Sequence, residues 1–237
     1  MTEDEKRAAG LLFDPRDPAL MAQKRKTHDL STRYNSTLEE ESEVRTAILR
    51  EIFGNCGQTI AVQGPIYIHY GCHTTVGDCF FANFNLTIQD DAAVTIGDHC
   101  DFGPNVTIVT PLHPLLGRER QALSTESGEE KRLCYAKPVT IGNRCWICAG
   151  VTICPGVTIG DDCVIAAGSV VTRDIPAGSL AAGVPCRVLR PITEADSIYR
   201  SRWLWPRGEV KICVPGANCL GTLEQYNMPQ VKYPGVE

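Results

Sequence analysis

The residue best suited to acid–base chemistry lies in a stretch that departs from the pattern of the rest of the chain. His113 stands between Pro111 and Pro114, within residues 109–138, which show no periodicity of their own. A long stretch of this kind inside a repetitive chain is usually functional or disordered, and its prolines favour a histidine held in place. An imidazole titrates near neutral pH and can take a proton from a hydroxyl group, so His113 is our first candidate for a general base. The other histidines are His28, in a helical region, and His69, His73 and His99, in the repeat.

The elements that must position His113 follow a period of six residues. A helix would place apolar residues three and four apart and a half-buried strand would alternate, so a period of six indicates short strands joined by corners. Three such strands close one triangular coil of eighteen residues, in which Ile141 and Ile159 stack about 4.8 Å apart. An ordinary sandwich with Gly-rich turns is the alternative that this period disfavours. The inward rows are Ile141, Ile147, Ile153, Ile159, Ile165 and Val171, and, two residues earlier, Val139, Cys145, Val151, Val157, Cys163 and Ser169.

The same period appears less regularly before the interruption. It begins with Ile60 and Ile66 and continues through Val76, Ala82 and Ile88 to Ile96, Phe102 and Ile108. The step from Ile88 to Ile96 is eight residues and breaks the register by two. The pattern therefore predicts an all-β repeat over residues 58–190, interrupted by an excursion at residues 109–138.

Two further segments flank the repeat. Residues 1–57 read as helical, with Thr2 and Glu5 as a capping box and Asp17 before Pro18 as a helix start. An apolar stripe then comprises Val44, Ile48, Leu49 and Ile52. These helices are expected either to brace the site or to cap the open end of the coils. Residues 191–237 form a loop-rich C-terminal extension whose aromatic residues are expected to pack over a neighbouring subunit.

The composition of the chain bears on three questions: whether it spans a membrane, whether it binds nucleic acid, and which cellular compartment it occupies. The chain has 237 residues, 43% of them hydrophobic, and no apolar run as long as a membrane span. A net charge of −5 disfavours nucleic acid as the main partner. Acidic residues follow Met1 where a signal peptide would be basic and then apolar, so the twelve cysteines are expected to be thiols in the cytoplasm.

The stretch from Cys145 to Cys148 has the spacing of a redox or zinc motif. Cys145 falls on an inward position of the repeat and Cys148 on a corner, so the two thiols should diverge. No second pair lies at zinc-finger spacing, and we therefore predict no metal site here.

Several stretches resemble the galactoside and maltose O-acetyltransferases, the sugar branch of the hexapeptide-repeat acyltransferases. The resemblance spans residues 5–190 and implies a left-handed parallel β-helix assembled as a homotrimer with active sites between subunits. It also implies transfer of an acetyl group from acetyl-CoA to a sugar hydroxyl. The matching stretches are residues 81–88, 90–91, 94–98, 113–114, 137–142, 146–147, 155–161 and 181–188.

The resemblance assigns roles to individual residues. It makes His113 the general base and places the acceptor beside His69, Asn83 and Asp91, whose polar groups suit hydroxyl recognition. Two positions depart from the family: His69 replaces a smaller polar residue, and Cys134 replaces Met or Glu. Cys134 could accept an acyl group, but with no base beside it we interpret it as a wall of the site. For acetyl-CoA, the matching residues are Trp146, Ala149 and Ala167 for the pantetheine arm, and Thr172, Arg173, Arg187 and Arg190 for the nucleotide and its phosphates.

Two other functions remain open from the sequence. A zinc lyase of the carbonic-anhydrase type would need three of the histidines at positions 69, 73, 99 and 113 to converge. A non-catalytic scaffold with the same fold is favoured by the departures at His69 and Cys134 and disfavoured by the intact His113, Asn83 and Asp91.

Overall fold

The computed structural model describes residues 1–124, 128 and 130–198. Met1–Pro191 form one compact unit, and Ile192–Glu237 form a second. The described residues of the second unit contain the short helix η2 (Glu194–Asp196). The expected packing of the C-terminal aromatic residues concerns Trp203, Trp205, Tyr226 and Tyr233, which lie outside the described residues.

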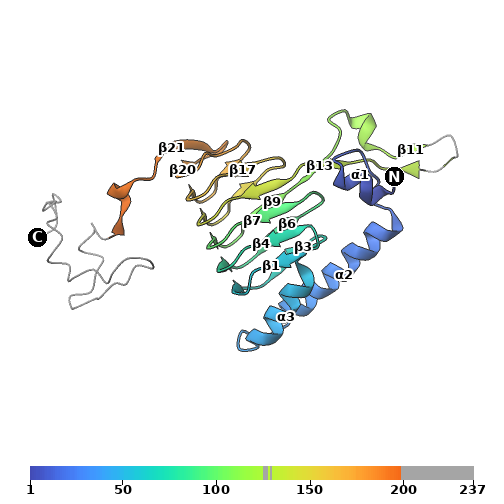
Figure 1. Cartoon of the computed structure of the whole chain (residues 1–237). Helices are drawn as coiled ribbons and strands as arrows, with labels where there is room; N and C mark the ends of the chain where they lie inside the picture. Colours follow the sequence, from blue (N-terminus) through green and yellow to red (C-terminus); the bar gives the residue numbers. More distant parts are fainter. Residues whose placement is uncertain (125–127, 129, 199–237) are drawn as a thin grey trace, which may run out of the picture. The chain divides into compact units, whose positions relative to one another are not determined.

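Short parallel strands stack into a three-sided coil, as the period of six predicts (Figure 1). Face 1 contains β1 (Asn55–Cys56), β4 (Thr74–Val76), β7 (Val94–Ile96), β14 (Val139–Ile141) and β17 (Thr158–Ile159). Face 2 contains β2 (Ile60–Val62), β5 (Phe80–Ala82), β8 (Asp101–Phe102), β15 (Trp146–Ile147), β18 (Val164–Ile165), β20 (Ser179–Ala182) and the antiparallel β21 (Arg187–Pro191). Face 3 contains β3 (Ile66–Ile68), β6 (Leu86–Gln89), β9 (Thr107–Val109), β16 (Thr152–Ile153) and β19 (Val170–Val171).

The interior consists of the two predicted inward rows. Ile141 pairs with Ile159 on the next coil, and Ile147 pairs with Ile165, which confirms the eighteen-residue register. Every member of both rows is at most 2% exposed, including the two thiols Cys145 and Cys163. Cys148, in contrast, lies at a corner and is half-buried. The two cysteines of the predicted motif therefore diverge.

The first coils differ from the predicted register. They begin one strand earlier, at β1, and their paired residues are twenty apart, as with Val76 and Ile96. Ile60 pairs with Phe80 and Ile66 with Leu86. We had placed Ile60 and Ile66 in the inward row that contains Ala82 and Ile88, but they belong to the other inward row, whose members lie two residues earlier on each strand. The physical reason is two additional residues at the corner between faces 3 and 1, which lengthen each early coil without displacing its buried side chains.

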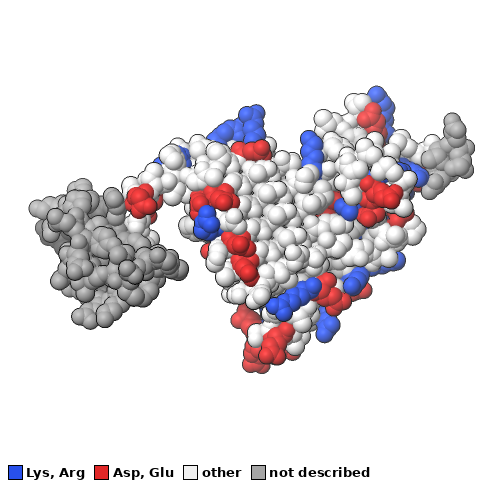
Figure 2. Space-filling model, in the orientation of Figure 1, with Lys and Arg blue, Asp and Glu red and all other residues white. Residues whose placement is uncertain are grey.

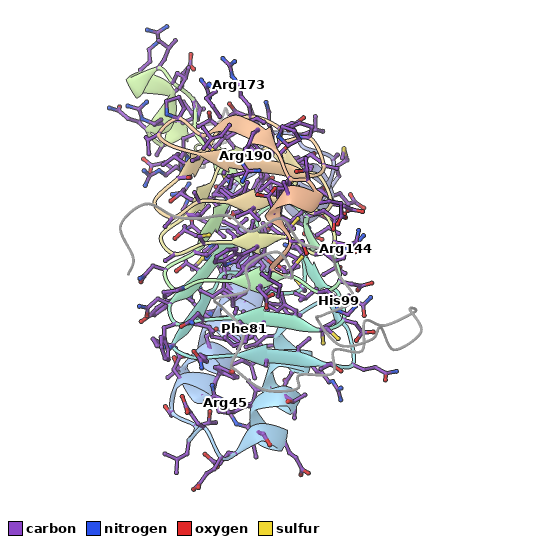
Figure 3. All side chains as sticks on the ribbon, turned by 90° about the vertical axis from the view of Figure 1, so that its left-hand side faces the viewer. Arg45, Phe81, His99, Arg144, Arg173 and Arg190 are labelled. Carbon is purple, nitrogen blue, oxygen red and sulfur yellow. The ribbon has the colours of Figure 1, made fainter. Side chains whose placement is uncertain are left out.

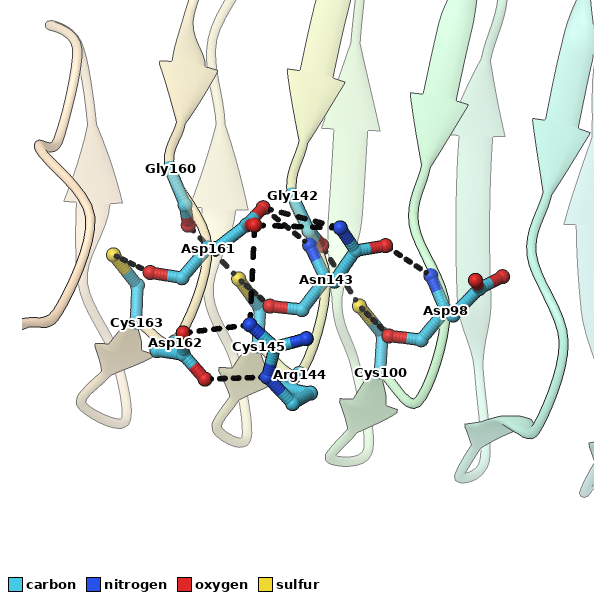
Figure 4. Close-up of polar contacts among 10 residues, drawn as sticks. All are labelled: Asp98, Cys100, Gly142, Asn143, Arg144, Cys145, Gly160, Asp161, Asp162 and Cys163. Atoms are coloured by element: carbon cyan, nitrogen blue, oxygen red, sulfur yellow. Dashed lines mark hydrogen bonds and ion pairs between the residues drawn. The ribbon is translucent and has the colours of Figure 1, made fainter.

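A glycine and an Asp or Asn shape the corner between faces 1 and 2 (Figure 4). The backbone N–H of Asp98 donates to Oδ1 of Asn143 at 2.9 Å, and the N–H of Asn143 donates to Oδ1 of Asp161 at 2.8 Å. A Cβ added at Gly97 would lie 2.6 Å from that Asn143 oxygen, so the preceding residue must be glycine. Arg144, which follows Asn143, has φ 54°, and its guanidinium binds Asp162 on the next coil at 2.6 Å. Side chains of one coil therefore hold the backbone of its neighbour.

Three helices precede the coils: α1 (Glu3–Ala8), α2 (Pro18–Asn35) and α3 (Ser42–Ile52). The capping box of Thr2 and the helix start at Asp17 are confirmed. Ile48, Leu49 and Ile52 join the coil interior and close its open end, whereas Val44 is 40% exposed and was wrongly included in the stripe. Asn35 completes this end, because its side chain accepts from the Ile66 N–H at 2.7 Å and donates to the Ile66 carbonyl at 2.9 Å.

The excursion has more structure than the sequence indicated. β10 (Pro111–Leu112) pairs with β13 (Tyr135–Ala136), and β11 (Leu123–Ser124) pairs with β12 (Glu130–Lys131), both antiparallel. The short helix η1 (Gly117–Arg120) lies between β10 and β11. The excursion is thus a hairpin that leaves the coil at the corner between faces 3 and 1.

Charged side chains are unevenly distributed over the surface. In the view of Figure 2 they gather near the helices, the excursion and the last coils, and leave most of the coil surface without charge. Among the described residues, none of the helices combines the length and the apolar composition that a bilayer crossing needs.

Thiol labelling tests the inward register. In folded protein we expect Cys145 and Cys163 to react about a hundredfold more slowly than the exposed Cys72 and Cys79, because labelling them requires the coils to open. Timed alkylation followed by peptide mass spectrometry measures the rates, and denatured protein serves as the control. Rapid labelling of both buried thiols in native protein would show that the register is wrong. Cys213 and Cys219, which we also expect to react quickly, lie outside the described residues.

Candidate active site

The structure divides the predicted site residues between two corners. His69, Asp91, Cys134 and the excursion bearing His113 occupy the corner between faces 3 and 1. Asn83, Ala149 and Ala167 occupy the corner between faces 2 and 3, and Trp146 lies on face 2. Each strand of face 3 has two to four residues, so roughly 10 Å of sheet separates the corners within one chain. One chain therefore does not bring all the predicted acceptor residues together.

His113 is positioned by backbone pairing on both sides of the excursion. It directly follows β10, which is paired with β13. Cys134, just before β13, exchanges two hydrogen bonds of 3.0 Å with Phe13 from the N-terminal segment. At the base of the hairpin, the Lys137 N–H donates to the Thr110 carbonyl at 3.0 Å. The backbone next to His113 is thus fixed, while its side chain is exposed.

Glu3 connects the N-terminal segment with the outer part of the hairpin through hydrogen bonds and an ion pair. Its carboxylate accepts from the Asp14 N–H at 2.7 Å and from Lys6 at 2.7 Å, and lies 3.6 Å from the Lys131 ammonium. Burial favours a higher pKa for Glu3, but these hydrogen bonds and charges outweigh it and leave the pKa lowered. The carboxylate therefore remains ionised and joins α1, the segment after it and β12.

Two adjacent carboxylates at this corner have different roles. Asp90 is structural, because it accepts from the Tyr70 N–H at 2.8 Å and from the Thr74 hydroxyl at 3.0 Å. Asp91 is only 5% exposed, and no other described residue donates a hydrogen bond to its carboxylate. Burial, and then the charge of Asp90, raise the pKa of Asp91 to about 6. Asp91 is thus a buried acceptor of hydrogen bonds with capacity left for a ligand.

His69 lies at the same corner as Asp91 and is a neutral imidazole. It is half-buried, and its ring meets the Tyr70 ring edge to face with centroids 5.0 Å apart. Burial, and then the charge of Lys24, lower the pKa of His69 to about 4. At neutral pH this imidazole offers one donor and one acceptor to a hydroxyl group.

Cys134 lines the same corner as an un-ionised thiol. It is 2% exposed and packs with Phe13, Leu20 and Tyr70. Burial, and then the charge of Asp91, raise the pKa of Cys134 to about 12. A thiol in this state is a poor nucleophile, which favours our interpretation of Cys134 as a wall residue.

The residues predicted to bind acetyl-CoA lie on face 2, at the corner after it and on the last strands. Trp146 is 55% exposed on face 2, and Ala149 and Ala167 follow at the next corner on neighbouring coils, where the Gly168 N–H donates to the Ala149 carbonyl at 2.8 Å. The predicted basic group is split between two elements. Thr172 and Arg173 follow β19, whereas Arg187 and Arg190 lie on β21. Figure 3 shows Arg173 and Arg190 near the C-terminal end of the coils and His99 and Arg144 along another edge.

The sequence analysis missed three residues at the corner between faces 3 and 1. Arg7 is 7% exposed and donates to the Asp91 carbonyl at 2.8 Å, and the Lys24 ammonium lies 5.6 Å from the centre of the Tyr70 ring. Tyr70 is fully buried and its hydroxyl has no partner among the described residues. The sequence held no clear signal for them, because a Lys or Arg on a helical pattern looks like a solvated surface charge and Tyr70 lies in the irregular first part of the repeat.

The histidines give the zinc alternative no geometric support. His99 lies at the corner between faces 1 and 2, away from His69, His73 and the excursion. Within the described parts of the chain, no group of three or more His, Cys, Asp or Glu side chains is arranged to hold a metal ion.

Comparison with known proteins identifies both parts of the unit. Residues 6–57 match the maltose acetyltransferase hexapeptide capping motif, and residues 138–173 match the bacterial transferase hexapeptide with six repeats. The chain is 42% identical over 199 residues to the galactoside O-acetyltransferase of Escherichia coli, which covers 84% of this chain and 94% of that protein.

Solved structures agree with the sequence comparison and with the predicted left-handed parallel β-helix. A galactoside acetyltransferase in complex with coenzyme A superimposes with a TM-score of 0.75 at 42% identity, covering 83% of this chain and 94% of the other. A hexapeptide-repeat acetyltransferase from Vibrio cholerae, in complex with acetyl coenzyme A, gives a TM-score of 0.72 at 36% identity, covering 82% and 100%.

The raised pKa of Asp91 predicts an effect on stability. The folded protein holds this proton up to about pH 6, whereas the unfolded chain releases it near pH 3.8, so folding becomes less favourable as pH rises through that window. Relative to Asp91→Asn, the unfolding free energy of the wild type should fall by about 2 to 3 kcal/mol between pH 4 and pH 6. Urea denaturation at several pH values measures the difference, with the exposed Asp29→Asn as the matched control. A difference that stays constant with pH would mean that Asp91 titrates normally.

Proposed function

The chain belongs to the galactoside and maltose O-acetyltransferase family of hexapeptide-repeat enzymes, and on that premise we propose that it acetylates a hydroxyl group of a sugar, with His113 as general base. It is an acetyl-CoA-dependent O-acetyltransferase. The proposal concerns the acceptor, the base and the assembly of the site.

The reaction is a direct transfer. His113 takes the proton of the acceptor hydroxyl while the hydroxyl oxygen attacks the carbonyl carbon of acetyl-CoA. A new ester bond forms as the carbon–sulfur bond breaks, and the proton passes from His113 to the departing thiolate. The un-ionised, buried state of Cys134 supports a route without an acetyl-enzyme.

One observation carries the proposed acceptor. Asp91 is a buried carboxylate without a donor from another described residue, and it lies at the corner from which the His113 hairpin emerges. A buried polar group is stable only when it is hydrogen-bonded, and sugar hydroxyls are donors that suit a carboxylate. The neutral His69 next to it adds a donor and an acceptor for a second hydroxyl.

The separation of the corners supports a homotrimer. His113 and Asp91 lie at one corner and Asn83 and Trp146 at or near another, so a site that uses all of them has to be shared between two chains. A three-sided coil offers such a shared cleft to each neighbour in a closed ring of three, and cyclic symmetry then repeats the site three times.

The ten free cysteines of the described residues support a reducing compartment such as the cytoplasm.

Removing the proposed base tests the chemistry. His113→Ala should lower turnover by about a hundred- to ten-thousandfold, because the acceptor hydroxyl keeps its proton. Affinity for acetyl-CoA should change little, since its proposed contacts lie elsewhere. Release of free coenzyme A thiol measures turnover, with Cys134→Ala as the control that keeps most of its activity. Near-normal turnover of His113→Ala, or acetylated Cys134 after incubation with acetyl-CoA alone, would replace this route by a ping-pong reaction through the thiol.

Mixed oligomers test the shared site. His113→Ala and Asn83→Ala are each expected to be nearly inactive. Refolding them together in equal amounts should restore about a quarter of wild-type activity, because in a random cyclic assembly one interface in four pairs an intact His113 with an intact Asn83. Light scattering measures the assembly and the thiol assay measures activity. If both residues act within one chain, mixing will restore nothing.

A further inference from the structure

The segment between α1 and α2 runs along the half of the hairpin that returns to the coil. Phe13 and Cys134 form an antiparallel bridge, with backbone hydrogen bonds of 3.0 Å in both directions. On the other side of the returning half, Leu112 pairs with Tyr135. The next pair in this antiparallel register is His113 with Cys134. The backbone of Cys134 therefore lies between those of Phe13 and His113.

Asp14 is at the centre of the polar contacts that hold this segment on the hairpin. It is 7% exposed, and its carboxylate accepts from the Arg16 guanidinium at 3.2 Å and from the Arg132 N–H at 3.4 Å. The Asp14 N–H donates to the Glu3 carboxylate at 2.7 Å. Arg16 also donates to the Glu130 carbonyl at 2.5 Å. One buried carboxylate thus joins α1, the segment after it and the returning half of the hairpin.

The carboxylate of Asp14 is ionised at neutral pH. Burial favours a higher pKa for Asp14, but the hydrogen bonds from Arg16 and the charge of its guanidinium outweigh burial and leave the pKa lowered. Hydrogen bonds between charged groups are stronger than those between neutral groups. The contacts of Asp14 are therefore the ones whose loss should affect the hairpin most.

The hairpin receives little support from its own packing. The described residues from Leu115 to Ser124 are all exposed, and Leu115 is 93% exposed. The strands β10 and β13 have two residues each, and an isolated two-stranded hairpin is at best marginally stable in water. Pairing with Phe13 adds a third extended segment, so the order of the hairpin depends on the N-terminal segment.

We infer that Asp14 is a positioning residue for the reaction: it holds Phe13 against Cys134 and thereby fixes where His113 lies. The inference rests on the proposed function, because it takes His113 to be the general base. A base works only within hydrogen-bond reach of the proton that it removes, and a displacement of about 1 Å can cost about a hundredfold in rate. Asp14 acts through backbone pairing and needs no contact with the acceptor.

Substitution of Asp14 with and without the base tests this. With methyl galactoside as acceptor, Asp14→Ala should lower kcat by about ten- to a hundredfold and leave both KM values nearly unchanged. The same change in the His113→Ala background should have little further effect, because no imidazole remains to be positioned. Asp14→Asn keeps an oxygen that can accept from Arg16 and should recover part of the loss. The exposed Asp29→Ala is the control that keeps full activity.

Hydrogen exchange measures the hairpin independently of activity. In Asp14→Ala, peptides that contain β10 and β13 should exchange about tenfold faster than in wild type, because the third segment no longer holds them. Peptides that contain β16 and β17, in the regular coils, should exchange as before. Thermal melts check that each variant is folded.

Other outcomes would overturn the inference. A loss of kcat in the His113→Ala background as large as in wild type would show that Asp14 does not act through His113. A higher KM for methyl galactoside with unchanged kcat would show that Asp14 contacts the acceptor, and unchanged exchange would show that the hairpin does not depend on it. Failure of the proposed function looks different: His113→Ala would then keep near-normal turnover, while exchange of the hairpin would still depend on Asp14.

Discussion

Repetition of the interior is the constraint on which this molecule depends. Each strand turns only one or two side chains inward, and each of these stacks on its equivalents in the coils above and below, as Ile141 does on Ile96 and Ile159. A change of shape in one coil would leave a void or a clash in two neighbours, so the inward positions have little freedom. The Gly–Asx corner adds a second repeated restraint through hydrogen bonds between coils. Chemistry is therefore confined to outward positions, corners and insertions.

One corner carries almost all of the irregularity. Between faces 3 and 1 the first two coils each hold two additional residues, and the third holds the whole excursion. These additions contain His69, Asp91 and His113, and the N-terminal segment packs onto them through Phe13 and Thr27. The regular coils thus act as a rigid base on which an irregular corner is built, in keeping with the placement of functional groups on loops fixed by a scaffold.

Burial gives this corner an unusual distribution of charge. Asp90 accepts hydrogen bonds from the Tyr70 N–H and the Thr74 hydroxyl, while Asp91 beside it retains capacity for a ligand. Cys134 and His69 are both held in their uncharged forms by the same burial. The buried walls are therefore suited to recognise neutral hydroxyl groups, whereas His113 lies exposed on the hairpin that leaves the coil at this corner.

The sequence alone determined the coil, because the period of six follows directly from the stacking of inward side chains on successive coils. It also marked the corner between faces 3 and 1 as irregular, since the excursion bearing His113 and the eight-residue step both interrupt the period there. Only the tertiary structure showed that α2 lies along that corner, that Lys24 and Tyr70 belong to it, and that Asn83 is on another edge. A local pattern reports which side chains face inward within an element, but the contacts between a helix and a coil forty residues away depend on three-dimensional packing that no period encodes.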